Sequence, residues 1–282
     1  MTPIIDCHVH ICPGEVRQNR EKFLEGEPEF SAIYSDPRAV LIGASELIES
    51  MDAEQVAQSV VFGFPWRKKE NFRLNNDYVL DAARRFSGRL IPFCCLDPTH
   101  PRALKEVKRC LAGGARGVGE LAFYEQGLGP AALSALSPLA ACLAEAELPI
   151  LLHTNEPVGH AYPGKSPMGL NQIYNLIKAH PTVKWILAHG GGGLPFFGYL
   201  KKEVRDVLAN CWFDTAAFPF LYRPEALACL AGGVGPDKLL FGTDFPLLPP
   251  SRYYRDFARS GLSRQELQGL YGNNISRILT AP

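Results

Sequence analysis

Short apolar runs alternate with amphipathic stretches along most of the chain. The runs are rich in β-branched and aromatic residues, which is typical of buried strands, and apolar residues recur at helical spacing between them. The pattern predicts strands at residues 4–11, 58–63, 89–96, 115–121, 149–153, 183–189, 211–215 and 238–244. It predicts helices at residues 45–51, 75–86, 103–111, 133–147, 171–180, 196–210, 224–231 and 251–279.

Strands that are apolar throughout and alternate with helices predict a parallel sheet covered on its outer face. Eight such strands in 282 residues favour a closed barrel over an open doubly wound sheet. No G-x-G-x-x-G follows the first strand, which argues against a dinucleotide-binding fold. We therefore expect one α/β domain, residues 1–282, folded as a (β/α)8 TIM barrel with an extra C-terminal helix.

The predicted first strand is followed by a long polar segment, residues 12–44, that contains several prolines and glycines. A connection of this length in a compact domain is usually functional, so we expect a lid or binding loop here. Ser45 is the expected N-cap of the helix that follows it.

Composition and charge exclude several classes of protein. The chain has 29 basic and 29 acidic residues, which argues against nucleic acid or an anionic membrane as its main partner. Its eight cysteines include the adjacent pair Cys94 and Cys95 but no C-x-x-C, so we expect reduced, buried thiols. Neither a secretory signal nor an apolar run of about 18 residues is visible, which predicts a cytoplasmic protein.

Histidines and acidic residues stand at the predicted carboxyl ends of several strands, where the active sites of TIM barrels lie. These are His8, His10, Glu120, His153, His189 and Asp244. Alternation along the first strand places Asp6, His8 and His10 on one face. Imidazole and carboxylate ligands suit zinc or manganese. Each residue alone has an ordinary structural explanation, such as a turn cap or a core histidine, but the coincidence of six favours a metal centre.

Four motifs carry a resemblance to a known family. They are D-C-H-V-H at residues 6–10, L-H-T-N-E-P at 152–157, A-H-G-G-G at 188–192 and G-T-D-F-P at 242–246. Together they resemble the amidohydrolase superfamily, in particular its amidohydrolase-related branch. That branch holds metal-dependent hydrolases and enzymes of the aminocarboxymuconate semialdehyde decarboxylase type. The resemblance implies a distorted barrel with one or two divalent ions, zinc being our first expectation and manganese the alternative.

The resemblance also implies a role for each residue. His8, His10, His153 and Asp244 would hold the principal ion, and Asp244 would also accept the proton of a metal-bound water. His189 would polarise the substrate or bind a second ion. Glu120 would bridge two ions, or it is a salt-bridged rim residue. Asp6 would orient a ligand histidine.

Substrate-binding residues are less sharply indicated. The loop at 154–168, with His160 and Tyr162, is expected to overhang the metal, and Trp66 is expected in an aromatic pocket unless it simply packs. Basic residues near 17–22 and 67–69 either receive a carboxylate or form a solvated surface. We expect a small-molecule substrate and allow for a homodimer.

Three functions stay open at the level of the sequence. The first is metal-dependent hydrolysis of an amide, lactone or ester, which the two-metal interpretation of Glu120 favours. The second is nonoxidative decarboxylation, which the branch resemblance keeps open. The third is a metal-binding barrel without turnover.

Overall fold

Eight parallel strands form the centre of the computed structural model, which describes residues 2–279. Three of them pair in the order β1-β2-β3, and the other five pair in the order β4-β5-β6-β7-β8. Their bounds are β1 Ile4–His10, β2 Val56–Phe62, β3 Leu90–Pro92, β4 Val118–Leu121, β5 Pro149–Leu152, β6 Lys184–Leu187, β7 Cys211–Asp214 and β8 Leu239–Leu240. All eight predicted strands are present, although β3 and β8 are much shorter than expected.

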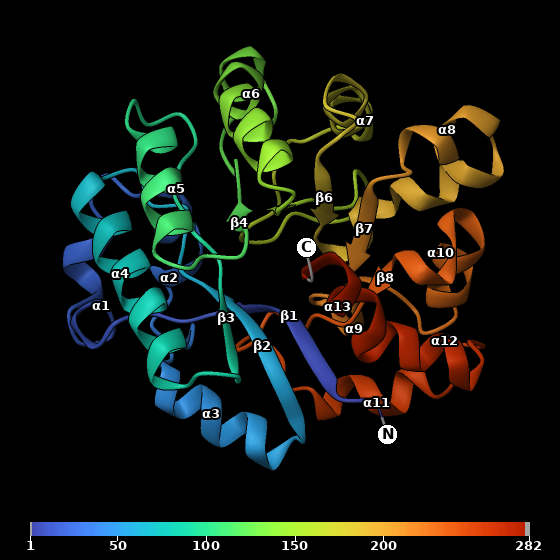
Figure 1. Cartoon of the computed structure of the whole chain (residues 1–282), viewed down its shortest axis with the longest axis horizontal. Coiled ribbons are helices and arrows are strands. Elements are labelled where there is room, and N and C mark those ends of the chain that lie inside the picture. The colour runs from blue at the N-terminus through green and yellow to red at the C-terminus, as the bar shows by residue number, and fades with distance from the viewer. Residues whose placement is uncertain (1, 280–282) are drawn as a thin grey trace.

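Backbone contacts join the two sheets at both seams. Cys94, just after β3, bridges to Val118 on β4 in the parallel sense, and Val9 on β1 bridges to Phe245, which follows β8. Additional hydrogen bonds cross the second seam, such as the Cys7 N–H to the carbonyl of Phe241 at 2.8 Å. The strands therefore follow one another around a distorted (β/α)8 barrel, with helices around the outside (Figure 1).

Helices follow most of the strands, as the sequence pattern predicts. Their bounds are α3 Ala44–Ala53, α4 Lys69–Arg85, α5 Ala103–Ala112, α6 Pro130–Glu145, α7 Leu170–Ala179, α8 Lys202–Val207, α9 Phe218–Leu221, α10 Ala226–Val234, α11 Ser251–Phe257, α12 Arg264–Gln268 and α13 Asn274–Leu279, with short irregular turns η2 His189–Tyr199, η3 Pro236–Lys238 and η4 Gly269–Asn273. Two expectations were wrong in detail. The N-cap of α3 is Gly43 and not Ser45. The predicted helix at 196–210 is divided between η2 and α8.

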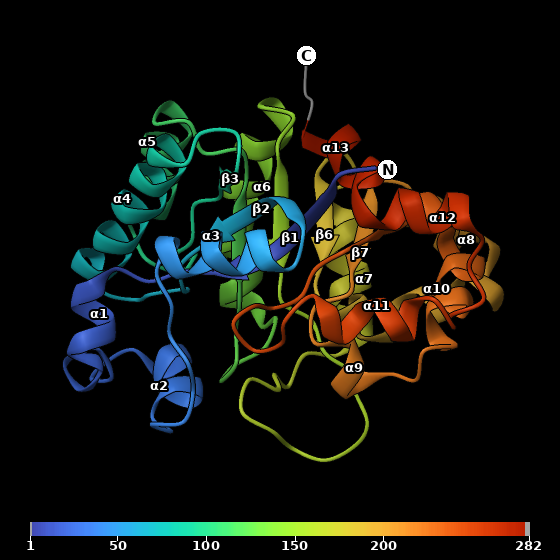
Figure 2. The same ribbon diagram turned by 90° about the horizontal axis from the view of Figure 1, so that it is seen from below.

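The segment after β1 is not an unstructured loop, because it folds into α1 Gly14–Gln18, η1 Arg20–Phe23 and α2 Pro28–Tyr34. Glu27 anchors it by accepting hydrogen bonds from the backbone N–H groups of Arg67 and Lys68. The α2 helix lies at the same edge of the molecule as α9 and the loop between β5 and α7 (Figure 2). Three chain segments that are far apart in sequence therefore surround one end of the barrel.

Apolar side chains fill the barrel interior and separate its two ends. An inner cluster contains Ile5 and Cys7 of β1, Phe62 of β2 and Leu151 of β5. The last helix, α13, contributes Ile275 and Ile278 to the same cluster, so the extra C-terminal helix closes the interior. The chemistry is therefore confined to the opposite end, where the strands terminate.

Two expectations from the sequence concern the state of the cysteines and the presence of a membrane-spanning helix. All eight thiols are free, and six of them are buried, but Cys142 is half-buried and Cys229 is exposed. Within residues 2–279, no helix is both long and apolar enough to cross a bilayer. The predicted single domain, 1–282, includes Met1 and residues 280–282, which lie outside the described residues.

Candidate metal centre

The six predicted strand-end residues meet at the carboxyl end of the barrel. His8 and His10 lie on β1 and Glu120 lies on β4, and all three are buried. The other three lie within four residues of the end of a strand: His153 after β5, His189 after β6 and Asp244 in the turn after β8. The side chain of Asp244 is 18% exposed. The barrel topology therefore brings together residues that are more than 230 positions apart in the chain.

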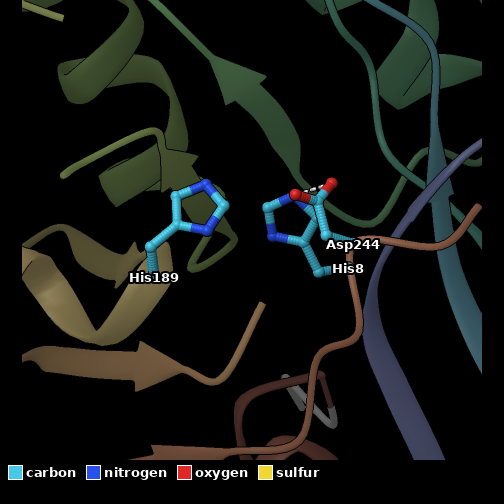
Figure 3. A group of neighbouring side chains, drawn as sticks. All are labelled: His8, His189 and Asp244. Atoms are coloured by element: carbon cyan, nitrogen blue, oxygen red, sulfur yellow. Dashed lines mark ion pairs between the residues drawn. The ribbon is translucent and has the colours of Figure 1, made fainter. Parts of the chain in front are cut away.

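Donor atoms from four of these residues converge. Nε2 of His8 is 3.6 Å from Oε2 of Glu120 and 3.6 Å from Oδ1 of Asp244. Nε2 of His10 is 3.6 Å and 3.4 Å from the same two oxygens. Two ligands that each lie about 2.1 Å from one tetrahedral ion are about 3.4 Å apart. Figure 3 shows the rings of His8 and His189 and the carboxylate of Asp244 facing a common space.

Hydrogen bonds set the tautomers of three imidazoles so that Nε2 faces this space. The Nδ1–H of His8 donates to Oδ2 of Asp214 at 2.8 Å. The Nδ1–H of His10 donates to the carbonyl of Gly63 at 2.9 Å, and that of His189 donates to the carbonyl of Ala216 at 3.0 Å. Carbonyl and carboxylate oxygens only accept, so in the neutral imidazole, which is the form that binds a metal, the proton is on Nδ1 and the lone pair is on Nε2. Histidine ligands of metals are usually oriented in this way.

His153 lies in a second trio with Glu120 and His189. Its Nδ1 is 2.9 Å from Oε1 of Glu120 and 3.2 Å from Nε2 of His189. The prediction that His153 completes the ligand set of the principal ion stays a prediction. The two oxygens of Glu120 face different trios, as a bridging carboxylate would.

The imidazoles favour the ionised form of the two carboxylates, and any second proton that such a ring carries on Nε2 is released when a cation binds there. Burial opposes the ionisation of Glu120, but the neighbouring imidazoles, that of His8 first, outweigh it and hold the pKa of Glu120 well below its usual range. Burial also opposes the ionisation of Asp244, but hydrogen bonding to His10 and the nearby imidazoles lower the pKa of Asp244 to about 2. Both carboxylates are therefore ionised at neutral pH, as metal ligands must be.

The residues present fit a divalent ion. Nε2 of His8 is buried and has no hydrogen-bond partner among the described residues. A buried polar atom without a partner costs free energy, and a cation between this nitrogen and the carboxylates of Glu120 and Asp244 would remove that cost. The combination of imidazole and carboxylate donors suits zinc and manganese alike, so it leaves the identity of the metal open.

Two candidate residues adopt a backbone conformation that is uncommon for their type. His189 has φ 56° and Asp244 has φ 62°, both in the left-handed region. A hydrogen bond from its backbone N–H group holds each residue in place. His189 N–H donates to Oδ1 of Asp214 at 2.9 Å, and Asp244 N–H donates to the carbonyl of His8 at 3.0 Å. Such conformations persist where surrounding contacts over-determine them, and they are concentrated at functional sites.

Asp214 is the carboxylate that orients His8, and the sequence analysis missed it. The expected residue was Asp6, but the β1 register shifts between Asp6 and Val9, so strict alternation is interrupted there. Asp6 instead accepts hydrogen bonds from the backbone N–H groups of His8 and Thr243. Asp214 is the last residue of β7 and the next-to-last residue of the predicted seventh strand, 211–215, and this position at the rim was the available signal.

A cavity of about 980 Å³ opens above the cluster. Five of the six candidate residues line it, the exception being His8, which is fully buried. The loop between β5 and α7 contributes His160 and Tyr162 to the lining, and their part in binding the substrate stays a prediction. Trp66 was wrongly expected here. It packs in the core against Phe30, with its indole N–H bonded to Asn75.

Several lining residues were not anticipated. Tyr34 of α2 and Tyr124 after β4 place phenol groups in the cavity wall, and Arg38 lies nearer the mouth. Burial raises the pKa of Tyr34 and of Tyr124 well above the usual value, so both hydroxyls remain protonated donors. Two of the basic residues proposed from sequence are engaged elsewhere: Arg17 pairs with Glu46, and Arg67 pairs with Glu29, Asp97 and Glu125.

A family model described as Amidohydrolase matches residues 5–280. Because this match spans nearly the whole sequence, the chain belongs to the amidohydrolase family, as the motifs indicated. Among curated proteins it is similar to a 2-keto-4-carboxy-3-hexenedioate hydratase from Sphingobium sp. (strain NBRC 103272 / SYK-6). The two are 23% identical over 349 aligned positions, which cover 99% of this chain and 96% of the relative.

Solved structures of similar fold include several decarboxylases. A 5-carboxyvanillate decarboxylase from Sphingomonas paucimobilis has a TM-score of 0.77 at 14% identity, with 100% of each chain covered. A dihydroxybenzoic acid decarboxylase from Polaromonas sp. JS666, solved with manganese and 2-nitroresorcinol, has a TM-score of 0.72 at 17% identity, covering 99% of this chain and 97% of that one. At these identities the likeness confirms the fold alone.

Proposed function

We propose that this enzyme is a metal-dependent carboxy-lyase that releases CO₂, without oxidation, from a hydroxylated aromatic or conjugated carboxylic acid. The observation that carries the proposal is the spacing of Nε2 of His8, Nε2 of His10, Oε2 of Glu120 and Oδ1 of Asp244, which suits a single ion. Decarboxylation needs one ion to hold the acid and needs no attacking water. Folds of this kind also include decarboxylases crystallised with manganese.

The reaction breaks the bond between the substrate carbon and its carboxylate carbon. The electron pair stays on the substrate carbon, CO₂ leaves, and a proton takes its place. A divalent ion held by His8, His10, Glu120 and Asp244, with His153 as a further donor, would supply positive charge that binds the carboxylate and a neighbouring oxygen and disperses negative charge.

The protein's own residues would position the acid and move the proton. Asp244 is partly exposed to the cavity, so it is the carboxylate best placed to exchange a proton with bound substrate. The hydroxyls of Tyr34 and Tyr124 would donate hydrogen bonds to substrate oxygens. The apolar walls limit the access of water, which strengthens these interactions.

Hydrolysis, the first expectation from the sequence, becomes the second candidate. It is favoured by Glu120, whose Oε1 faces His153 and His189 while its Oε2 faces His8 and His10. Two ions bridged by this carboxylate would provide a water nucleophile and would fit hydrolysis better than decarboxylation.

The test is a direct comparison of the two chemistries in the protein loaded with manganese or zinc. We expect CO₂ release from members of a panel of 2-hydroxybenzoates and conjugated carboxylic acids, and no hydrolysis of a matched panel of amides, esters and lactones. Hydrolysis without CO₂ release would contradict the proposal. Inactivity toward both panels, with metal bound at the cluster, would favour a barrel that binds metal without turnover.

A further inference from the structure

Exposed apolar side chains gather at the mouth of the cavity. Within residues 2–279, seven large apolar residues are exposed. Four of them line the cavity: Val40 (57% exposed), Val158 (73%), Phe220 (64%) and Leu247 (53%). We call these four the apolar rim. They come from four separate connections at the carboxyl end of the barrel, following β1, β5, β7 and β8.

Less exposed apolar residues line the same cavity as the apolar rim. They are Ile33, Phe64, Leu221 and Pro246, of which Phe64 is buried and the others are half-buried, and we call them the apolar wall. Single exposed apolar residues are ordinary on a protein surface and need no explanation. A group of them around one opening marks a place where apolar matter binds.

The charges near the mouth are already compensated by neighbours. Arg38 pairs with Asp36 at 2.7 Å, and Lys165 pairs with Glu156 at 2.8 Å, while Tyr162 also donates to Glu156. A second carboxylate on the substrate, far from the metal end, would meet neither of these cations unpaired. The cavity is therefore polar at its base and apolar with compensated charge toward its mouth.

We propose that the substrate is an amphipathic acid: its carboxylate lies at the metal cluster, and an alkyl or aryl extension follows the apolar wall to the rim. This inference rests on the proposed function for the acid end and adds the class of substituent at the other end. Small acids without such an extension would leave the upper cavity and the rim in contact with water, so they would bind less tightly.

The test is a homologous series of 2-hydroxybenzoates that carry alkyl chains of increasing length on the ring carbon opposite the carboxylate. Dissociation constants are measured by calorimetry with the manganese-loaded protein, whether or not turnover occurs. Each methylene that reaches the wall or rim is expected to tighten binding by up to about fourfold, until the chain extends past the rim. An affinity that stays constant or falls with chain length would overturn the inference.

Rim variants locate the effect. The double variant Val158→Ser and Leu247→Ser is expected to reduce the gain in affinity of the longest ligands by about tenfold relative to the unsubstituted acid. Leu200→Ser is the matched control, because Leu200 is 69% exposed and lies outside the cavity lining. An equal loss in both variants would overturn the inference. So would a changed oligomeric state of the double variant, by light scattering, with its ligand affinities retained, because the rim would then be a protein interface.

This inference and the proposed function can fail separately. Tighter binding of longer acids without any CO₂ release would support the amphipathic ligand and contradict the carboxy-lyase. CO₂ release from short acids, with no dependence of affinity or kcat/KM on chain length, would support the carboxy-lyase and contradict the extension.

Discussion

Asp214 determines whether His8 can serve as a metal ligand. Its Oδ2 accepts the Nδ1–H of His8 at 2.8 Å, while its Oδ1 accepts the backbone N–H groups of His189 and Ala216. One buried carboxylate thus fixes the tautomer of His8 and the main-chain position of His189. Partners of this kind tune metal affinity without touching the ion.

We predict that Asp214→Asn weakens metal binding by about 10–100-fold while the fold is retained. With its oxygen still on the two backbone N–H groups, the new amide would point its NH₂ at Nδ1 of His8. His8 would then have to carry its proton on Nε2, which would remove the lone pair from the cluster. Competition with a fluorescent chelator measures the affinity. Asp81→Asn, at an exposed site on α4, is the control; equal affinity in the two variants would remove the role assigned to Asp214.

We predict that Asp244→Asn retains the fold and loses at least about 100-fold in kcat, because the amide cannot exchange the proton that the reaction requires. Circular dichroism checks the fold, and CO₂ release or product formation on the best substrate of the panel gives the rate. A near-normal kcat would exclude Asp244 as the proton-transferring group and leave it, at most, as a ligand.

Some residues of the site could be predicted from sequence and others could not. Strand-end positions suffice to bring His8, His10, Glu120, His153, His189 and Asp244 together, because parallel strands end at one rim. Asp214 gains its role only through contact with His8, 206 positions away, which no local pattern records. Asp6 was expected to orient a ligand histidine, but a register shift in β1 breaks the alternation on which that expectation depended. Trp66 was expected in the pocket wall, but the sequence does not distinguish a tryptophan in the core from one that lines a pocket.

At the scale of elements, the four glycines after His189 shape the wall of the site. Gly190, Gly191, Gly192 and Gly193 all have positive φ, between 62° and 90°. A Cβ on Gly192 would lie 2.3 Å from the carbonyl oxygen of Asn155, so the turn and the loop after β5 approach more closely than any side chain allows. These two segments carry His189 and His153.

We predict that Gly192→Ala lowers the free energy of unfolding by about 2–5 kcal/mol, combining the cost of a left-handed backbone with that of the clash. Gly88→Ala is the matched control, since Gly88 has φ +80° and open space around its position. The free energy of unfolding of Gly88→Ala should fall only by the cost of the left-handed backbone, about 1–2 kcal/mol. Chemical denaturation measures both, and equal losses would show that the close approach to Asn155 contributes nothing.

The elements themselves were predictable where apolar periodicity is strong. The central strands and helices lie close to their expected positions, whereas β8 is reduced to Leu239–Leu240 because hydrogen bonds to β1 replace regular pairing beyond it. The short helices α1 and α2 were missed because the prolines and glycines of 12–44 indicate loops. They fold because Glu27 and the packing of Phe30 against Trp66 anchor them to the barrel.

At the scale of the whole molecule, the count of strands predicts the barrel, but not the two seams, which depend on register between strands distant in sequence. The type of reaction could not be predicted from the sequence either. Imidazole and carboxylate donors suit a divalent ion in hydrolysis and in decarboxylation alike, so the ligand types do not distinguish the two reactions. The separation of the donor atoms and the shape of the cavity do bear on the choice, and both arise only in the folded chain.

The most direct test of the proposed metal centre is anomalous diffraction at the manganese edge from crystals grown with Mn²⁺. We predict a single strong peak among Nε2 of His8, Nε2 of His10, Oε2 of Glu120 and Oδ1 of Asp244, and its loss in His8→Ala. A cluster without a peak in the presence of excess Mn²⁺, or an undiminished peak in His8→Ala, would contradict the prediction.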